Sequence, residues 1–378
     1  MGDALDPTGL LVKMRRGRKE QCVPVSNALA RRLAFALFGL LVLIVPALAQ
    51  APAPAGLTLS AVRARGHLIC AGSDPLPGFA AVNSQGFWIG FDVDFCRAVA
   101  AAVFGDPSRI EFRALTGDAR FAELQTGDVD LVARDADWTM RRDTRYGASY
   151  VAPIFYDGQA FMVAQSLNIV SAYQLDNLKV CVLDQGDQLA NLREFAFVNQ
   201  ASYTEVLYED REDLAVAYRK KLCDAVSAPA SWLNAIRRSM DDPGGQRILP
   251  ERISKSVFGP VVRQGDDQWF KIVQWTAFAL IDAEEAGITS LNIQSLTAAQ
   301  THRIRRLLGL EGNFGAALGL DNDFIKNVIV AVGNYGEIFD RNFGPDTGAA
   351  VARGQNALWS NGGLIYAPNV DADGVGGN

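Results

Sequence analysis

The sequence predicts an α/β protein of two lobes joined by two extended segments, and three observations support this prediction. Short apolar strands alternate with amphipathic helices in two separate series along the chain. The stretch "FYDGQAFMVA" (155–164) joins the two series as an extended apolar segment, and "SKSVFGPVV" (254–262) is typical of a return strand. A chain that crosses out and back in this way forms two lobes with a cleft between them, hinged on two strands.

The first series begins with the short buried strand "LICAG" (68–72), which ends in the Pro/Gly loop "SDPLPGF". The turn "NSQG" (83–86) favours a hairpin between two short strands. In "DVDFCRAVAAAVFGD" (92–106) apolar residues recur at helical spacing, and Gly105 closes the predicted helix. The strand "RIEFRAL" (109–115) follows it.

Helix, turn and strand then recur in the same order in both halves of the chain. "RFAELQTGDVDLVA" (120–133) predicts a helix, a terminating Gly127 and a strand, and "DLAVAYRKKLCDAVSA" (213–228) repeats the order. Between them, "LKVCVLDQGDQLANL" (178–192) predicts a strand, a turn and a helix start. A long helix follows the return strand, with Asp266 or Asp267 as its N-cap. Each half therefore carries its own βα series.

The first fifty residues differ from the globular remainder. The chain has 378 residues, of which 49% are hydrophobic and 21% charged, enough for two ordinary domains. Near the N-terminus, basic residues precede the apolar run "LAFALFGLLVLIV" (33–45), and "ALA" ends at Ala49. This order predicts a secretory signal peptide over residues 1–49 that is cleaved near Ala49, followed by a linker over residues 50–56. The alternative, a membrane anchor, is disfavoured because the run is too short to cross a bilayer.

Charge excludes some partners. Residues 1–49 hold seven bases and three acids, so their removal lowers the net charge from −6 to −10. A chain this acidic has no basic stripe for nucleic acid and no face for anionic lipid. We therefore expect neither partner.

Four cysteines remain after the predicted cleavage: Cys70, Cys96, Cys181 and Cys223. An even number in an exported chain indicates disulfides, and three connectivities are possible. The spacing favours Cys70–Cys96 and Cys181–Cys223, because each pair then stays within one half of the chain. The alternative is four buried thiols.

The sequence offers little for metal or cofactor chemistry. The cysteine spacings match no metal-ligand pattern, and the chain has only two histidines, His67 and His302. We therefore expect no metal and no cofactor. A two-lobe α/β protein with a cleft is either a closing binding protein or an enzyme, so both classes stay open at this point.

Several long motifs resemble one family. "GFDVDFCRAVAAAVFGD", "ERISKSVFGPVVRQGDDQWF", "WTAFALIDAEEAGIT", "VGNYGEIFDRN" and "RGQNALWSNGGLIYAP" are similar to the periplasmic solute-binding proteins of ABC importers, polar amino-acid class (family 3). Within that class they look most like the general L-amino-acid-binding branch. The resemblance covers nearly all of residues 57–368 and implies the type II two-lobe fold, with the ligand enclosed in the cleft between the lobes.

The resemblance also implies boundaries, partners and location. We expect lobe 1 to comprise residues 57–157 plus 260–368 and lobe 2 residues 158–259, with a flexible tail over residues 369–378. The protein is expected in the periplasm as a monomer that captures a small polar solute, an amino acid above all, and delivers it to an ABC permease.

The family's ligand site transfers in part. In this class the strand containing Asp130 leads to a loop whose hydroxyls and one Arg hold the amino acid's carboxylate, and that Arg falls on Arg142. A guanidinium suits the role because it offers two parallel donors and stays charged. Two more contacts are expected in this lobe, Thr139 beside Arg142 and Phe79 in the first Pro/Gly loop. The alternative is an Arg142 paired with Asp143 or Asp137 in a surface network.

The sequence departs from the family's pattern at several of these positions. The family usually carries Ser, Thr or Asn where this chain has Asp135 and Asp137. In lobe 2 the family's "GTT"-like turn appears as "QGDQ", which makes Gly186, Asp187 and Gln188 the expected contacts. The family's acid that receives the ligand's α-ammonium group is replaced by Pro229, which has no charge.

Three interpretations of these departures stay open. In the first, the acid has relocated, so Asp137 faces the ligand's cation while Arg142 holds its carboxylate. In the second, the ligand has changed to one that is more cationic or lacks an α-amino group. In the third, the protein is a paralogue that serves only as a partner or sensor component.

Catalysis is the weakest of the hypotheses. Some proteins of this fold are periplasmic dehydratases, but the cysteines are expected to be bonded and neither histidine falls in the predicted cleft. Asp135 and Asp137 are the only clustered carboxylates, and their Arg neighbours favour the ionised form, which is poor for a general acid. We therefore predict no catalytic residue.

Overall fold

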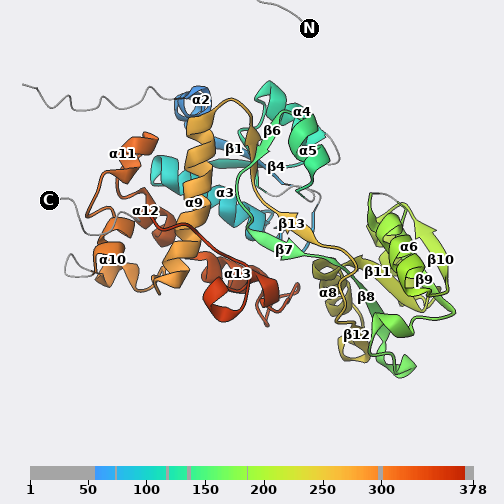
Figure 1. The fold of residues 1–378 in the computed structure, drawn as a ribbon. Coiled ribbons are helices and arrows are strands. Elements are labelled where there is room, and N and C mark those ends of the chain that lie inside the picture. The colour runs from blue at the N-terminus through green and yellow to red at the C-terminus, as the bar shows by residue number, and fades with distance from the viewer. Residues whose placement is uncertain are drawn as a thin grey trace, which may run out of the picture. The chain divides into compact units, whose positions relative to one another are not determined.

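The computed structural model describes residues 56–72, 75–115, 119–133, 138–184, 186–296 and 301–370, and the fold is given for these residues. They form two five-stranded sheets, each with its own helices, and two short two-stranded sheets (Figure 1). The predicted leader, nearly all of the linker and tail residues 371–378 lie outside the described residues. The two sheets define a first and a second lobe, as predicted.

The sheet of the first lobe has the strand order β4-β1-β5-β14-β6. Its parallel core pairs β1 with β4 and β5, while β14 runs antiparallel to both β5 and β6. The last strand in sequence thus returns to the middle of the first sheet. The strands are β1 (Leu68–Gly72), β4 (Ile110–Ala114), β5 (Leu131–Val132), β6 (Ala148–Tyr150) and β14 (Val261–Arg263).

The helices of the first lobe pack their apolar faces on this sheet and on one another. Helix α3 ends as predicted at Gly105, whose φ of 68° lets its N–H reach the carbonyl of Ala101. Helix α9 begins after Asp266, whose carboxylate accepts from the Trp269 N–H at 3.0 Å. The helices are α2 (Leu57–Arg65), α3 (Phe91–Phe104), α4 (Ala119–Thr126), α5 (Met140–Arg145), α9 (Asp267–Glu285), α10 (His302–Leu307), α11 (Phe314–Leu318), α12 (Phe324–Val332) and α13 (Tyr335–Phe343).

The sheet of the second lobe has the order β10-β9-β11-β8-β12. Strands β9, β10 and β11 are parallel, and β8 runs antiparallel to both of its neighbours, β11 and β12. The strands are β8 (Gln159–Ala164), β9 (Leu178–Leu183), β10 (Tyr203–Tyr208), β11 (Ala225–Pro229) and β12 (Gln246–Ile248). The helices are α6 (Gln188–Asn199), α7 (Arg211–Arg219) and α8 (Ala230–Arg238).

An antiparallel ribbon of β7 (Phe155–Asp157) and β13 (Ser256–Phe258) connects the two sheets along the chain (Figure 1). Strand β7 continues into β8 of the second sheet, and β13 continues into β14 of the first. Gly158 and Gly259 stand at the ends of the ribbon, where a Cβ would lie 2.4 Å and 2.1 Å from a backbone carbonyl oxygen. The other two-stranded sheet is the predicted hairpin of β2 (Ala81–Val82) and β3 (Trp88–Ile89).

Each lobe uses one Asp in the same way to fix its central strand. The Asp130 carboxylate accepts from the Ile69 N–H of β1 at 2.8 Å, and the Asp224 carboxylate accepts from the Lys179 N–H of β9 at 2.8 Å. Both bonds join a strand to the parallel strand beside it, so the recurring helix–turn–strand order of the sequence has a structural counterpart.

Both disulfides of the favoured pairing are present. Cys70–Cys96 ties β1 to α3, and Cys181–Cys223 ties β9 to the segment before β11. Each bond closes a loop within one lobe, with sequence separations of 26 and 42 residues. The ribbon between the sheets is therefore not crossed by a covalent bridge in the described part of the chain.

Candidate functional site

The segment that carries Arg142 is a short helix and not the loop that the resemblance implied. Thr139 is the N-cap of α5, and its Oγ1 accepts from the Arg142 N–H at 3.3 Å. The Asp143 N–H donates to the Thr139 carbonyl at 2.9 Å, which closes the first helical turn. A Thr cap followed by residues without Gly or Pro favours this turn. Thr139 and Arg142 are thereby brought together, both half-buried.

Trp138 anchors the start of this segment to two other elements. Its indole stacks on the Tyr150 ring of β6, with centroids 5.0 Å apart and planes 11° from parallel. Its backbone N–H donates to the Val257 carbonyl of β13 at 2.8 Å. The position of Arg142 is therefore coupled to the ribbon that connects the two sheets.

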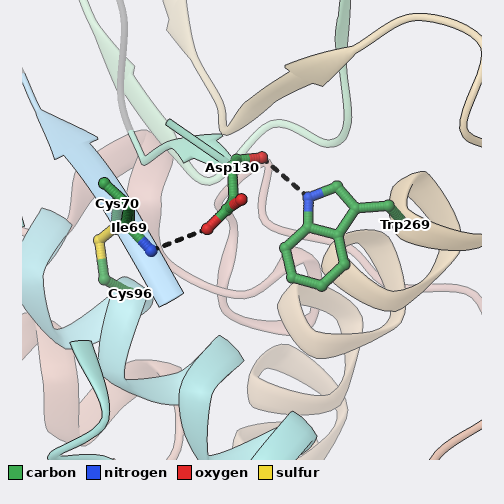
Figure 2. Close-up of a disulfide and its surroundings, with 5 residues drawn as sticks. All are labelled: Ile69, Cys70, Cys96, Asp130 and Trp269. Carbon is green, nitrogen blue, oxygen red and sulfur yellow. Dashed lines mark hydrogen bonds between the residues drawn. A yellow bond between two sulfur atoms is a disulfide. The ribbon is translucent and has the colours of Figure 1, made fainter. Parts of the chain in front are cut away.

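Asp130 holds the strand that leads to this segment (Figure 2). Besides its bond to Ile69, it accepts from the Trp269 indole N–H of α9 through its backbone carbonyl at 2.9 Å, and Arg65 donates to its carboxylate. Burial raises the pKa of the Asp130 carboxyl above its usual value, against the opposing effect of these donors. The carboxylate therefore serves the fold, because it fixes the start of β5 to β1.

In the second lobe the predicted turn precedes helix α6. Gly186 has a φ of 72°, a conformation that favours glycine, and Asp187 is the N-cap of α6. Both residues are exposed, whereas Gln188 is half-buried. The N-terminus of α6 therefore presents its first backbone N–H groups beside an accessible turn, which suits an anionic group of a ligand.

A polar cluster that the sequence analysis missed lies directly against this turn. The buried Gln159 amide donates to the Gln188 carbonyl at 3.0 Å and to the Ser227 hydroxyl at 2.8 Å, and its oxygen accepts from Asn191 at 3.1 Å. Within the described residues, the buried Oε1 of Gln188 has no hydrogen-bond donor. A Gln inside the apolar strand "QAFMVA" was the available signal for this cluster.

Pro229 ends β11 and directly precedes helix α8, which leaves the position expected for an acid without a charge. A nearby acid, Asp157 of β7, accepts from the Gly158 N–H at 2.8 Å and from the Ser231 hydroxyl at 2.6 Å. Burial raises the pKa of the Asp157 carboxyl, and the bond from Ser231 opposes that shift. Asp157 thus joins the ribbon to the start of α8.

Phe79 does not occupy the position expected of a ligand contact. Its side chain is fully buried, with ring centroids 4.7 Å from Phe343 and 4.8 Å from Phe155. An aromatic ring enclosed in this cluster contributes to the core of the first lobe and offers no surface to a solute. We therefore leave Phe79 out of the proposed site.

The remaining site predictions divide between the lobes. Thr139 and Arg142 lie in the first lobe, and Gly186, Asp187 and Gln188 lie in the second. Asp135 and Asp137 fall within residues 134–137, outside the described residues, so their role stays a prediction.

Over the described ranges, no three His, Cys, Asp or Glu side chains gather in a way that could hold a metal ion. No helix in the same ranges is long and apolar enough to span a membrane.

Comparison with known proteins identifies the family. The model of the bacterial extracellular solute-binding proteins, family 3, matches residues 68–287, more than half of the chain. The chain belongs to this family, as the sequence motifs indicated.

Two characterised relatives and one solved structure are similar over most of the chain. The general L-amino acid-binding periplasmic protein AapJ of Rhizobium johnstonii is 45% identical over 85% of this chain and 94% of its own length. The glutamate/glutamine/aspartate/asparagine-binding protein BztA of Rhodobacter capsulatus is 46% identical over 84% and 94%. A periplasmic binding protein of an ABC transporter from Brucella ovis, solved with glutathione bound, has 43% identity and a TM-score of 0.77, and covers 83% of this chain and 99% of its own.

Proposed function

We propose that the protein captures an amino acid outside the cytoplasmic membrane and delivers it to an ABC permease. The observation that carries this proposal is the similarity to two amino-acid-binding proteins, 45% and 46% identical, over 94% of the length of each. Both lobes fall within the matched length, so the similarity includes both halves of the predicted site.

The anionic end of the ligand is assigned to the first lobe. Arg142 offers two parallel donors to a carboxylate, and Thr139 adds a hydroxyl beside it in the same helical turn. Capping by Thr139 and the Trp138 anchor hold this turn in place, which lowers the conformational entropy lost when a ligand binds.

The second lobe contributes the turn before α6. The exposed backbone of Gly186 and Asp187 and the half-buried Gln188 lie at the N-terminus of this helix, where backbone N–H groups favour an oxyanion. The Gln159 cluster supports the turn from within the lobe and holds Gln188 through its carbonyl. Among the described residues the buried Gln188 Oε1 has no donor, and we propose that a ligand donor reaches it when the turn moves on binding.

The cationic end of the ligand is assigned to Asp137, with Asp135 beside it. A free amino acid brings an ammonium group, and an unpaired charge in a closed cleft costs several kcal/mol. Pro229 has no charge to offer. Asp157 is engaged by Gly158 and Ser231, so the assignment of the ammonium group to Asp137 is kept from the sequence.

Further parts of the proposal concern the molecule as a whole. Lobe 1 comprises residues 57–157 plus 260–368 and lobe 2 residues 158–259, and they close over the ligand around the β7–β13 ribbon. Residues 1–49 direct export and are removed near Ala49, and the protein works as a periplasmic monomer without catalytic activity.

One observation favours a second candidate ligand, a short peptide with an amino-acid end. The Brucella ovis relative was solved with glutathione bound, at 43% identity and a TM-score of 0.77. Glutathione carries an α-ammonium and an α-carboxylate at its γ-glutamyl end, so it suits the same assignment of Arg142 and Asp137. The departures at Asp135, Asp137 and Pro229 would then reflect a larger ligand.

The assignment of Asp137 is tested by calorimetric titration of three variants against a panel of L-amino acids and glutathione. Asp137→Ser should weaken binding of the preferred zwitterion about 30-fold or more, because it removes the ammonium's partner. Pro229→Asp should change little, since the ammonium is already paired. Asp241→Ser removes an exposed acid elsewhere in lobe 2 and serves as the charge control. Tighter binding by Asp137→Ser would refute the relocation of the acid.

A further inference from the structure

A cavity of about 550 Å³ lies on a part of the molecule that the proposed solute site does not use. Its walls come from helix α8, from the residues after β12 and from the segment 343–352 that ends α13 and follows it. This volume falls in the range typical of sites for small molecules. None of the residues that line it belongs to the predicted solute contacts.

Two guanidinium groups from the last turn of α8 line this cavity. Arg237 donates to the Asn234 side-chain oxygen at 2.9 Å, and Arg238 donates to the Pro345 carbonyl. In the described part of the chain, neither forms an ion pair with a carboxylate. Burial lowers the pKa of Arg237, and the adjacent charge of Arg238 lowers it further. Both cations therefore line one cavity, and no carboxylate among the described residues pairs with either.

A third arginine of the wall, Arg252, differs from this pair. It donates to the carbonyls of Leu249 at 3.1 Å and Pro250 at 3.3 Å. Its charge also acts on the carboxyl groups of Glu251 and Asp157, whose ionised forms it favours. The positive charge that lacks compensation is thus concentrated at Arg237 and Arg238.

The partial negative charge of a helix C-terminus does not by itself explain why Arg237 and Arg238 line a cavity. Cations in a last helical turn are stabilised by the helix dipole, and exposed Arg219 at the end of α7 has that benefit without lining this cavity. Arg237 and Arg238 additionally line a concave surface to which the half-buried Ile248 and Val351 contribute apolar walls. A polar end beside an apolar wall is the usual composition of a site for a small organic ligand.

We propose that this cavity binds a small organic anion, with its oxyanion group held by Arg237 and Arg238 and its apolar part against Ile248 and Val351. Guanidinium groups bind phosphate and carboxylate oxygens through paired donors. A phosphate monoester carries close to two negative charges at neutral pH, which matches the two unbalanced cations.

The proposal is tested with phenyl phosphate as the probe in calorimetric titrations of the full mature chain. We expect saturable binding that Arg237→Gln/Arg238→Gln weakens at least about tenfold, since charge-assisted hydrogen bonds are lost. Arg219→Gln, the matched change in the last turn of α7, should bind the probe like the wild type. Arg142→Ala should also leave the probe's affinity unchanged, which separates this cavity from the solute site.

A second variant tests the cavity without altering its charge. Ala350→Phe fills the space from the opposite wall and should abolish probe binding while both arginines stay in place. Circular dichroism and thermal unfolding verify that each variant is folded. Equal binding by wild type and the double Arg variant would overturn the proposal, as would equal affinity for inorganic phosphate, because the apolar wall would then contribute nothing.

Discussion

At the scale of single residues, the two lobes solve the same backbone problem differently. Gly127 and Lys221 each stand three positions before the Asp that fixes the central strand of their lobe, and both have positive φ, +85° and +56°. Glycine adopts this conformation at no steric cost, whereas a residue with a Cβ is strained there. The sequence shows a Lys in the second lobe at the place where the first lobe has a Gly. That Lys221 is strained could be recognised only from its backbone angle in the structure.

Lys221→Gly should therefore stabilise the protein by about 1 kcal/mol, because it relieves the left-handed conformation. The measurement is the free energy of unfolding in urea. Lys220→Gly is the matched control, since Lys220 has a φ of −80° and gains nothing from glycine. Equal effects of the two changes would contradict this account.

Prediction from sequence also worked unevenly at this scale. Arg142 was assigned by counting from Asp130 as the family resemblance implies, and the structure adds that Thr139 and Arg142 lie in one helical turn. The burial of Phe79 could not be predicted, because an aromatic residue in a Pro/Gly loop gives no sign of which way its ring points. Gln159 and Asp157 were missed because their hydrogen bonds join segments far apart in the chain, so no local pattern reports them.

At the scale of elements, the ribbon of β7 and β13 carries the connection between the sheets. The sequence predicted both strands from their extended apolar character, and the structure adds their pairing, with Val257 opposite Tyr156. It also adds the close approach of Gly259 to the Ala152 carbonyl. Such an approach depends on tertiary packing and leaves no trace in the sequence beyond the glycine itself.

Gly259→Ala should destabilise the protein by roughly 1–3 kcal/mol, because its Cβ would meet the Ala152 carbonyl oxygen and force the backbone to move. Thermal unfolding provides the measurement. Gly348→Ala is the control, since a Cβ there meets nothing within 4 Å. A Gly259→Ala protein as stable as this control would show that the ribbon accommodates the methyl group without strain.

The disulfides stabilise elements within each lobe. Replacing both cysteines of either pair by Ser should lower the free energy of unfolding by about 3–4 kcal/mol in the chain-entropy model, slightly more for Cys181–Cys223, which closes the longer loop. Urea denaturation of the two double variants measures this. An unfolding midpoint identical to that of the wild type would contradict a structural role for the bond concerned.

At the scale of the whole molecule, the family and the two-lobe α/β fold followed from long motifs spread over the chain, and the comparisons confirm the family. The alternation of strands and helices could be predicted because the local spacing of apolar residues determines it. The identity of the ligand could not be predicted from the sequence, since the residues expected to determine it are the ones in which this chain departs from the pattern of the family. Asp135, Asp137 and Pro229 would change the charge of the proposed site, but a change of charge does not identify a solute.

The central claim is that this protein binds an amino-acid carboxylate through Arg142. Calorimetric titration of the mature protein with the L-amino acids measures it most directly, beside the variants Arg142→Ala and Arg141→Ala. Arg141 is an exposed neighbour on the same helix, so its loss controls for charge. The account predicts saturable binding of at least one amino acid, unchanged by Arg141→Ala and weakened about 30-fold or more by Arg142→Ala. Equal affinity of the two variants for that amino acid, or no binding by any member of the panel, would contradict it.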